Sequence, residues 1–456
     1  MPSAFSGIEM ASRALRVFQR GLDVVGHNVS NVNTRGYSRQ TVEYATTTPL
    51  SFFDMRRLTI GSGVGISSIN RIRDGLLDQR LIAAQSEGGR FGALKASLGR
   101  IEPVFNEPGD AGISAALDRF FNAWSGLGSN PSDATRRYEV QLAAESLSSR
   151  IRGTARQLQE LSSQFGTQIE SAFDRVDQLS QRVAQLNTQI RQQMAMGEVP
   201  NDLLDQRDLA IDDLSRLINI TTFPNEDGTK TVFASSFALV DAGGAHPVPR
   251  TFDAATFSLQ DGTRTVSIRG GELYGMFESV NRLTAYRSQL DTFANALRDS
   301  VNALHMTGAP PSGETAVPFF LPTSSGALDF DLSALVRADT ANIASGTTTA
   351  AGDGGLALAL SQMRDTVHAG LGGQTFGQFY TDLVARVGRD TEIASYNLET
   401  HRAVIEQIEF QRQAVSGVSL DDEMATMLRL QRSYQAAAKL LSIFDQTTED
   451  LINIIR

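Results

Sequence analysis

Residues 8–32 read IEMASRALRVFQRGLDVVGHNVSNV, and this stretch carries the strongest structural signal in the chain. Its apolar side chains recur at alternating steps of three and four residues, which is the spacing of one face of an α-helix. The positions are Ile8, Ala11, Leu15, Phe18, Leu22, Val25, Val29 and Val32. The stretch is therefore predicted to be a helix that buries this face against a partner helix.

The other end of the chain has the same rhythm. Its positions, with one polar break, are Met427, Leu430, Tyr434, Ala437, Leu441, Phe444, Thr448 and Leu451. A second apolar row lies one position earlier on both helices, so each stripe is wide enough for more than one neighbour. We interpret the two ends as a coiled-coil pair that packs between subunits of an assembly. The alternative is a pair of core helices in an ordinary bundle.

Proline-free stretches predict the other long helices, because proline breaks helix interiors. The stretch after Pro131 has a heptad row of its own, at Phe165, Ile169, Ala172, Val176, Leu179, Val183, Leu186 and Ile190. No proline follows Pro322, and helix is predicted from about Phe376 to the end, with a break near Ser416-Gly417. The chain is therefore predicted to be mainly α-helical.

Residues 218–271 change to period-two alternation, which is typical of β-strands. Asp261-Gly262 lies between two alternating runs, and Asp227-Gly228 precedes another. Asp-Gly supplies the positive φ that a tight hairpin turn needs. We therefore expect a small β-rich insert, after which helix resumes at Glu272.

These patterns predict a discontinuous multidomain protein with three parts. Residues 1–65 and 415–456 form a terminal coiled-coil domain. Residues 66–217 and 272–414 form a helical-bundle domain with a loop-rich excursion at 307–355, where Gly, Ser, Thr and Pro are frequent. Residues 218–271 form the small β-rich domain.

Composition excludes several classes of function. The 456 residues carry a formal net charge of -10, which argues against general nucleic-acid binding. The chain has no cysteine, so disulfides, thiolate metal sites and Cys nucleophiles are excluded. No apolar stretch is long enough for a transmembrane helix, so no membrane insertion is expected. Arginines at 13, 16 and 20 interrupt the region where a signal peptide would be continuously apolar.

Candidate catalytic and metal-binding motifs are weak. The five histidines form no close ligand pair such as H-E-x-x-H. The acidic run at 202, 205, 208, 212 and 213 does not have the spacing of an EF-hand loop. There is no P-loop and no G-x-S-x-G elbow. We therefore predict no enzymatic activity, no cofactor and no metal.

Residues 28–40, NVSNVNTRGYSRQ, follow the first helix. Asparagine amides favour turns and caps, and Gly36 can adopt the positive φ that ends a helix. Taken alone, this pattern indicates only a helix followed by a capped turn.

The pattern Asn-x-x-Asn-x-x-Thr-x-Gly-Tyr behind a heptad helix resembles the signature of bacterial flagellar rod, hook and hook-associated proteins. The matching residues are Asn28, Asn31, Thr34, Gly36 and Tyr37. The continuation SRQ is most similar to the flagellar hook-associated protein 1 family. Further similar stretches are NPSD at 130–133, DLLDQRD at 202–208, NALH at 302–305 and SGVSLD at 416–421. The resemblance is weak across about 220–270 and 307–355.

The resemblance implies a structural protein that forms the junction ring between flagellar hook and filament. Its partners would be copies of itself, the hook protein, and the next junction protein or flagellin. It implies type III flagellar export to the cell exterior without a cleaved signal peptide, guided by a chaperone on the C-terminal helix. The assembly interface would consist of the apolar rows of both terminal helices together with Asn28, Asn31, Gly36 and Tyr37.

Two alternatives remain open at this point. One is another axial protein of the flagellum, either a hook protein or a flagellin-like protein. The other is an exported coiled-coil adaptor or effector that acts as a monomer. The number of copies per flagellum distinguishes the adaptor from a junction protein, because an adaptor would not form a ring on the flagellum.

Overall fold

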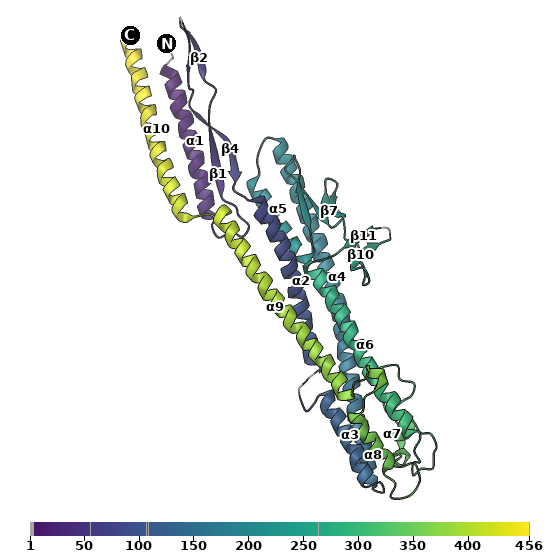
Figure 1. The fold of residues 1–456 in the computed structure, drawn as a ribbon. Coiled ribbons are helices and arrows are strands. Elements are labelled where there is room, and N and C mark those ends of the chain that lie inside the picture. Colours follow the sequence, from purple (N-terminus) through teal and green to yellow (C-terminus); the bar gives the residue numbers. More distant parts are fainter. Residues whose placement is uncertain (1–3, 55, 106, 108, 263, 456) are drawn as a thin grey trace. The chain divides into compact units, whose positions relative to one another are not determined.

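The computed structural model describes residues 4–54, 56–105, 107, 109–262 and 264–455. It is mainly helical with a few small antiparallel sheets (Figure 1), which confirms the predicted fold class. The helices are α1 (Ala4–Ser30), α2 (Gly75–Phe105), α3 (Ile113–Ser129), α4 (Ala134–Ala195), α5 (Asn201–Leu217), α6 (Gly271–His305), α7 (Ala334–Ala338), α8 (Gly355–Gln362), α9 (Phe376–Ser416) and α10 (Leu420–Ile455). Short 3-10 helices cover Thr340–Asn342, Met363–Asp365 and Ala369–Leu371.

The long helices lack proline except for α2, which contains Pro103 in its last turn. The heptad row of the middle stretch lies on α4, and all of its members except Leu179 are buried. The predicted break near Ser416-Gly417 separates α9 from α10. The helical periodicity was therefore a sufficient guide to these elements.

The β-rich segment is confirmed within residues 221–267. Its strands are β5 (Thr221–Pro224), β6 (Lys230–Ala234), β7 (Phe237–Asp241), β8 (Gly244–Ala245), β9 (Thr251–Asp253), β10 (Ser258–Asp261) and β11 (Arg264–Ser267). They form one sheet of order β5-β6-β7-β8 and another of order β11-β10-β9. Both predicted Asp-Gly turns join paired strands, with φ of 78° at Gly228 and 58° at Gly262.

A second β region was not predicted. Strands β1 (Gln40–Thr46) and β4 (Val64–Arg71) pair antiparallel, from Gln40↔Arg71 to Thr46↔Val64, and β2 (Leu50–Asp54) pairs with β3 (Arg56–Ile60). The β1–β4 pair packs against α1. Most side chains of β1 and β4 are exposed or only partly buried. Apolar alternation is limited to Val42 and Tyr44 in β1 and to Val64 and Ile66 in β4, which is a short signal for a strand.

The chain forms two compact units. One contains residues 1–88, 174–271 and 401–456, and the other contains residues 89–173 and 272–400. The terminal helices and the β-rich segment therefore belong to the same unit. The three-part division predicted from the sequence remains a prediction, because one compact unit can contain more than one domain.

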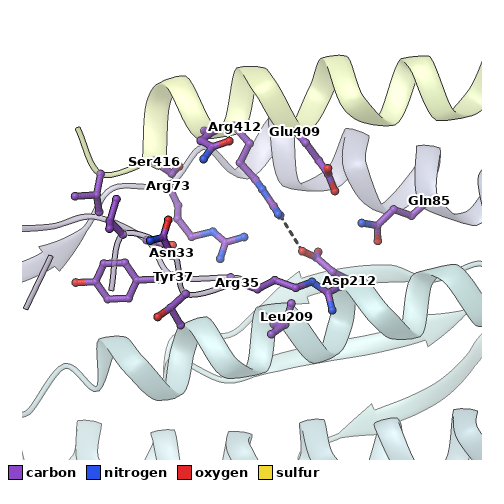
Figure 2. A pocket seen from close by; sticks show the side chains of 17 residues that line it. Asn33, Arg35, Tyr37, Arg73, Gln85, Leu209, Asp212, Glu409, Arg412 and Ser416 are labelled. Atoms are coloured by element: carbon purple, nitrogen blue, oxygen red, sulfur yellow. Dashed lines mark hydrogen bonds and ion pairs between the residues drawn. The ribbon is translucent and has the colours of Figure 1, made fainter. Parts of the chain in front are cut away.

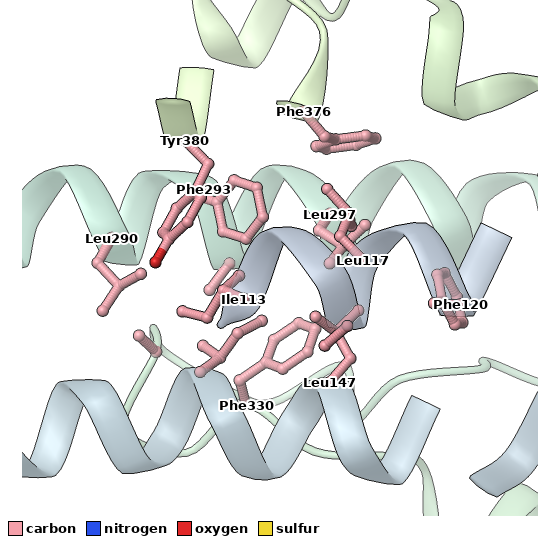
Figure 3. Packing of buried hydrophobic residues seen from close by; sticks show 14 of the residues in the cluster. Ile113, Leu117, Phe120, Leu147, Leu290, Phe293, Leu297, Phe330, Phe376 and Tyr380 are labelled. Atoms are coloured by element: carbon pink, nitrogen blue, oxygen red, sulfur yellow. The ribbon is translucent and has the colours of Figure 1, made fainter. Parts of the chain in front are cut away.

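The unit of residues 89–173 and 272–400 has a large apolar core. In Figure 3 the buried face of α3, with Ile113 and Leu117, meets Phe293 of α6 and Phe376 and Tyr380 of α9. An aromatic cluster continues this core, and its members are Phe120, Phe121, Trp124, Phe319, Phe320 and Phe330. Burial of such large side chains accounts for the stability of this unit.

The motif NALH holds the loop-rich excursion onto this core. The Asn302 side chain donates to the Phe320 carbonyl over 3.0 Å and accepts from the Phe320 N–H over 2.8 Å. His305 Nδ1 lies 2.7 Å from the Val317 carbonyl, and its Nε2 accepts from the Ala344 N–H over 3.1 Å. His305 is 1% exposed, so it packs at the helix end as a neutral imidazole.

We predict that His305 makes this unit sensitive to mild acid. Burial lowers the pKa of His305 to about 4 from 6.5, although its bond to the Val317 carbonyl raises it. Between these pH values the unfolded chain binds a proton that the folded chain does not. The free energy of unfolding should therefore fall by roughly 3 kcal/mol as the pH drops from 7 to 4.

Trp124 is the only tryptophan, and its ring lies 6.0 Å from that of His305, so its fluorescence reports urea unfolding of this unit. In His305→Gln the fall in the free energy of unfolding between pH 7 and pH 4 should be smaller by roughly 3 kcal/mol. This difference is expected however much the substitution destabilises the unit at pH 7. An equal dependence in both chains would contradict the prediction.

Candidate functional site

The two ends of the chain lie side by side as the antiparallel pair α1 and α10 (Figure 1). A Cβ atom at Gly7 would lie 2.7 Å from the Phe444 ring, and one at Gly21 would lie 3.2 Å from Leu430 Cδ1. Glycine at these positions therefore permits a close approach of the two helices.

The predicted residues of α10 face α1 over most of its length. Leu430 and Ala437 are buried, and Met427, Leu441 and Phe444 are partly buried. Tyr434 and Leu451 are exposed.

On α1 the face toward α10 is rotated by about one residue from the predicted row. Buried positions are Gly7, Ala11, Val17, Gly21, Val24, Val25 and Asn28, most of which belong to the neighbouring row. The predicted Ile8, Leu15, Phe18, Leu22 and Val29 are only partly buried. This neighbouring row is the second row predicted from the sequence, and Gly21 was among its members; Gly7, two heptads earlier, was not predicted.

The Asn-rich motif forms a turn that closes on α1. Asn31 Nδ2 donates to the His27 carbonyl, and the Thr34 hydroxyl donates to Asn31 Oδ1, both over 3.0 Å. Gly36 has φ of 83°, and a Cβ there would lie 3.2 Å from Leu209 Cβ, so the position requires glycine. Tyr37 donates its hydroxyl to Asn28 Oδ1 over 2.7 Å.

The Asn28 side chain forms hydrogen bonds with the backbone of Gln40, in the segment that follows this turn. Its Oδ1 accepts from the Gln40 N–H over 2.9 Å, and its Nδ2 donates to the Gln40 carbonyl over 2.9 Å. The same Nδ2 donates to Glu423 Oε2 over 3.1 Å. Asn28 is 1% exposed and each of its polar atoms has a partner, so its role is structural.

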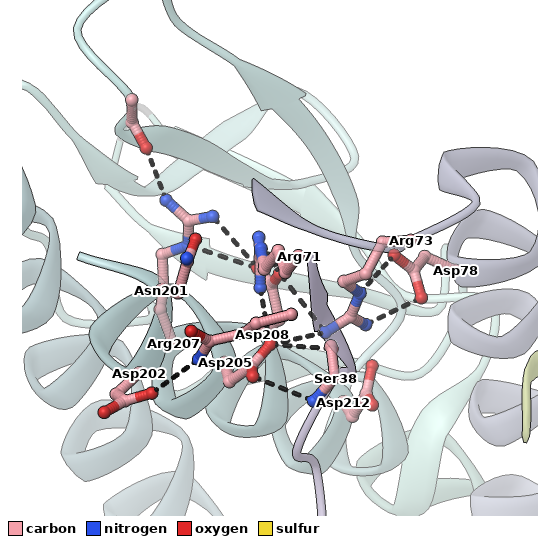
Figure 4. Close-up of polar contacts among 12 residues, drawn as sticks. Ser38, Arg71, Arg73, Asp78, Asn201, Asp202, Asp205, Arg207, Asp208 and Asp212 are labelled. Carbon is pink, nitrogen blue, oxygen red and sulfur yellow. Dashed lines mark hydrogen bonds and ion pairs between the residues drawn. The ribbon is translucent and has the colours of Figure 1, made fainter. Parts of the chain in front are cut away.

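The segment 38–40 docks on α5 (Figure 4). Ser38 donates both its N–H and its hydroxyl to the Asp205 carboxylate, over 2.9 and 2.8 Å. Gln40 Nε2 donates to Asp202 Oδ1 over 3.0 Å. The motif after the first helix and the DLLDQRD stretch are thus parts of one site, although more than 160 residues separate them.

The acidic run of α5 pairs with cations. Asp205 and Asp208 lie 2.8 and 2.7 Å from the Arg71 guanidinium, and Asp208 also pairs with Lys230 over 2.8 Å. Burial raises the pKa of Asp208, but the neighbouring cations lower it more, so its net pKa lies well below the usual value. The run therefore serves as a set of ion-pair partners.

A cavity of about 490 Å³ lies between the turn and the end of α9 (Figure 2). Arg412 of α9 pairs there with Asp212 of α5 over 2.8 Å. Burial raises the pKa of Asp212, and Arg412 opposes this shift. Arg73, also on the wall, pairs with Asp78 of α2 over 2.7 Å and with Asp208 of α5 over 3.4 Å. These charged groups hold α9 and α2 to α5.

Two family models match the chain. "Flagellar hook-associated protein FlgK helical domain" matches residues 98–320, and "Flagellar basal body rod FlgEFG protein C-terminal" matches residues 405–454. Flagellar hook-associated protein 1 of Bacillus subtilis is 27% identical over 99% of both chains. The Salmonella typhimurium protein of the same name is 24% identical over 98% of this chain and 99% of its own.

Over nearly its whole length the chain is similar to the flagellar hook-associated protein 1 family. This confirms the resemblance read from the motif, and the role of the chain is a structural one in the bacterial flagellum. A solved structure, the flagellar hook junction protein FlgK from Burkholderia pseudomallei, has the same fold, with a TM-score of 0.64 at 16% identity. It covers 74% of this chain and 100% of its own. None of the described helices is both long and apolar enough for a bilayer crossing.

We predict that Asp205→Ala weakens the docking of segment 38–40. The change removes the acceptor of two Ser38 hydrogen bonds and leaves Arg71 with fewer partners in a buried place. The free energy of unfolding of this unit should fall by about 3 kcal/mol. Circular dichroism in urea measures this, and trypsin should cleave after Arg39 faster than in the unchanged protein.

Asp213→Ala is the matched control on the same helix. Asp213 pairs with Arg35 over 2.7 Å, but the Arg35 side chain is 64% exposed. A surface pair of this kind contributes at most about 1 kcal/mol. Equal losses in the two variants would contradict the role assigned to Asp205.

Proposed function

We propose that this protein forms a ring at the junction between hook and filament by self-assembly through its terminal helices. The observation that carries the proposal is the apolar surface that α10 keeps outside its contact with α1. Exposed residues of this kind are Leu420, Met424, Leu428, Leu440, Ile443, Leu451 and Ile452.

This helix exposes more large apolar side chains to solvent than its packing against α1 explains. Leu440 and Ile443 are 52% and 47% exposed, and burial of this remaining half stabilises a contact by about 1 kcal/mol per side chain. Several exposed apolar side chains on one helix are typical of a helix that binds partners. Copies of the chain, the hook protein, and the next junction protein or flagellin are the partners we propose for it.

The same surface supports a proposal about export. We infer that the chain reaches the cell exterior through the flagellar type III export apparatus without a cleaved signal peptide. During export α10 would lack both α1 and its neighbours in the ring. An amphipathic helix in this state fits a chaperone groove, so we assign the chaperone to α10.

The test of the junction role is electron microscopy of cells that lack this gene. We expect hooks without filaments, and flagellin shed into the medium, because the filament would have no base on which to polymerise. Reintroduction of the gene should restore filaments. Filaments of normal length in the deletion strain would contradict the proposal and favour a monomeric adaptor.

Gly21→Leu tests whether α1 acts through its contact with α10. The new side chain would collide with Leu430 and with Tyr44 Oη, which lies 2.7 Å from the position of a Cβ at residue 21. Overpacking of this kind costs about 1–3 kcal/mol. We expect loss of swimming in soft agar and loss of the protein from purified hook–filament preparations.

Gly26→Leu is the matched control. It lies on the same helix, and a Cβ there would meet nothing within 4 Å. Both changes raise the helix propensity of α1 by about 1 kcal/mol, so only packing distinguishes them. Normal swimming of the Gly21→Leu strain, or equal defects in both strains, would contradict the assignment.

A further inference from the structure

Three contacts between α1 and α10 share one relation between their residue numbers. The residue numbers of the pairs Gly7–Phe444, Gly21–Leu430 and Asn28–Glu423 each add up to 451. Both sides advance by multiples of seven, so these pairs occupy one heptad position along the antiparallel seam. The same rule places Ala14 opposite Ala437, which is 4% exposed.

The apolar part of this seam does not define its own register. If α10 slid by one heptad along α1, small residues of α1 would still face apolar residues of α10. Gly21 would face Ala437, or Ala14 would face Leu430. Both arrangements bury apolar surface against a small residue, so packing alone distinguishes them weakly.

Glu423 is the exception in the row. It is 1% exposed, and its carboxylate accepts from Asn28 Nδ2 over 3.1 Å and from Arg39 Nε over 2.7 Å. A slide by one heptad would place this carboxylate against Gly21, or would place Leu430 against Asn28. Either arrangement buries a polar group without a partner, which is strongly unfavourable.

The same contact connects the pair to the rest of its unit. Asn28 holds both backbone groups of Gln40, and Arg39 donates its N–H to the Ser416 carbonyl at the end of α9 over 2.9 Å. Segment 38–40 in turn docks on Asp205 of α5. The contact at Glu423 is therefore the point where α1, α10 and segment 38–40 meet.

We infer that Glu423 is a positioning residue that selects one register of α1 against α10 and aligns the terminal pair with segment 38–40. The inference rests on the proposed function, because a single register gives every copy in the ring the same outer surface. A buried polar pair that excludes alternative registers is a known device of coiled coils.

Cysteine cross-linking measures the register directly, because the natural chain has no cysteine. We would place Ala14→Cys with Ala437→Cys to report the observed register, and Ala14→Cys with Leu430→Cys or Phe444→Cys to report the two shifted ones. Oxidation of the purified full-length chain should give the 14–437 disulfide. A parent chain that forms the shifted disulfides equally well would overturn the inference.

Glu423→Ala should lower the yield of the 14–437 disulfide at least about fivefold and should produce the shifted ones. Asp422→Asn is the matched control, because it removes one negative charge from the same first turn of α10 at an exposed position. It should leave the yields unchanged. Equal yields in Glu423→Ala and Asp422→Asn would overturn the inference.

A second variant separates register from stability. Glu423→Leu replaces the carboxylate by an apolar side chain and leaves the Asn28 bonds to Gln40 in place, so the helices should still pair. We expect all three disulfides to form in similar amounts. Retention of the 14–437 disulfide alone would show that packing selects the register, and would overturn the inference. The proposed function fails independently, if the parent chain is absent from the hook–filament junction.

Discussion

The alignment of the two chain ends with segment 38–40 depends on a buried contact between an amide and a carboxylate, Asn28 and Glu423. Each group is almost fully buried, and each would be costly without the other. The side-chain amide of Asn28 can make four hydrogen bonds, and it makes them with Tyr37, Gln40 and Glu423. The bonds of Asn28 are complete only when α1, the turn that follows it and α10 are all in place. We therefore expect these three elements to form together rather than separately.

The two compact units of the chain are stabilised in different ways. The unit of residues 89–173 and 272–400 has an apolar core in which aromatic side chains predominate, and such a core requires only volume and shape. The other unit holds segment 38–40 to α5 through hydrogen bonds to Asp205, and it holds α2 and α9 to α5 through pairs of carboxylates and guanidinium groups. Ion pairs contribute less net stability than apolar burial does, but they specify geometry, because a misplaced charge is heavily penalised. The ion pairs therefore fix the positions of the elements that surround α5.

Much of the fold could be predicted because helical periodicity is a local signal. The α4 heptad row, the break before α10 and the Asp-Gly hairpins depend on residues within one or two turns of each other. The β1–β4 ribbon was missed because its side chains are mostly exposed or partly buried and its apolar alternation covers only a few residues. Of the two rows predicted on α1, periodicity could not tell which one faces α10, because glycine contributes nothing to an apolar count, while its missing side chain is what admits Phe444 and Leu430.

The sequence by itself determined that both ends are amphipathic helices, that a β-rich segment interrupts the helical part, and that the chain resembles the flagellar hook-associated family. These conclusions need only spacing and short motifs. Only the tertiary structure showed that the Asn-rich turn and the acidic run of α5 form one site, since Ser38 and Asp205 meet across 167 positions of the chain. It also decided the role of Glu423, which in sequence is one of three consecutive acidic residues at the start of a helix. Its two neighbours are exposed while Glu423 is buried, and burial depends on what the rest of the chain brings to that place.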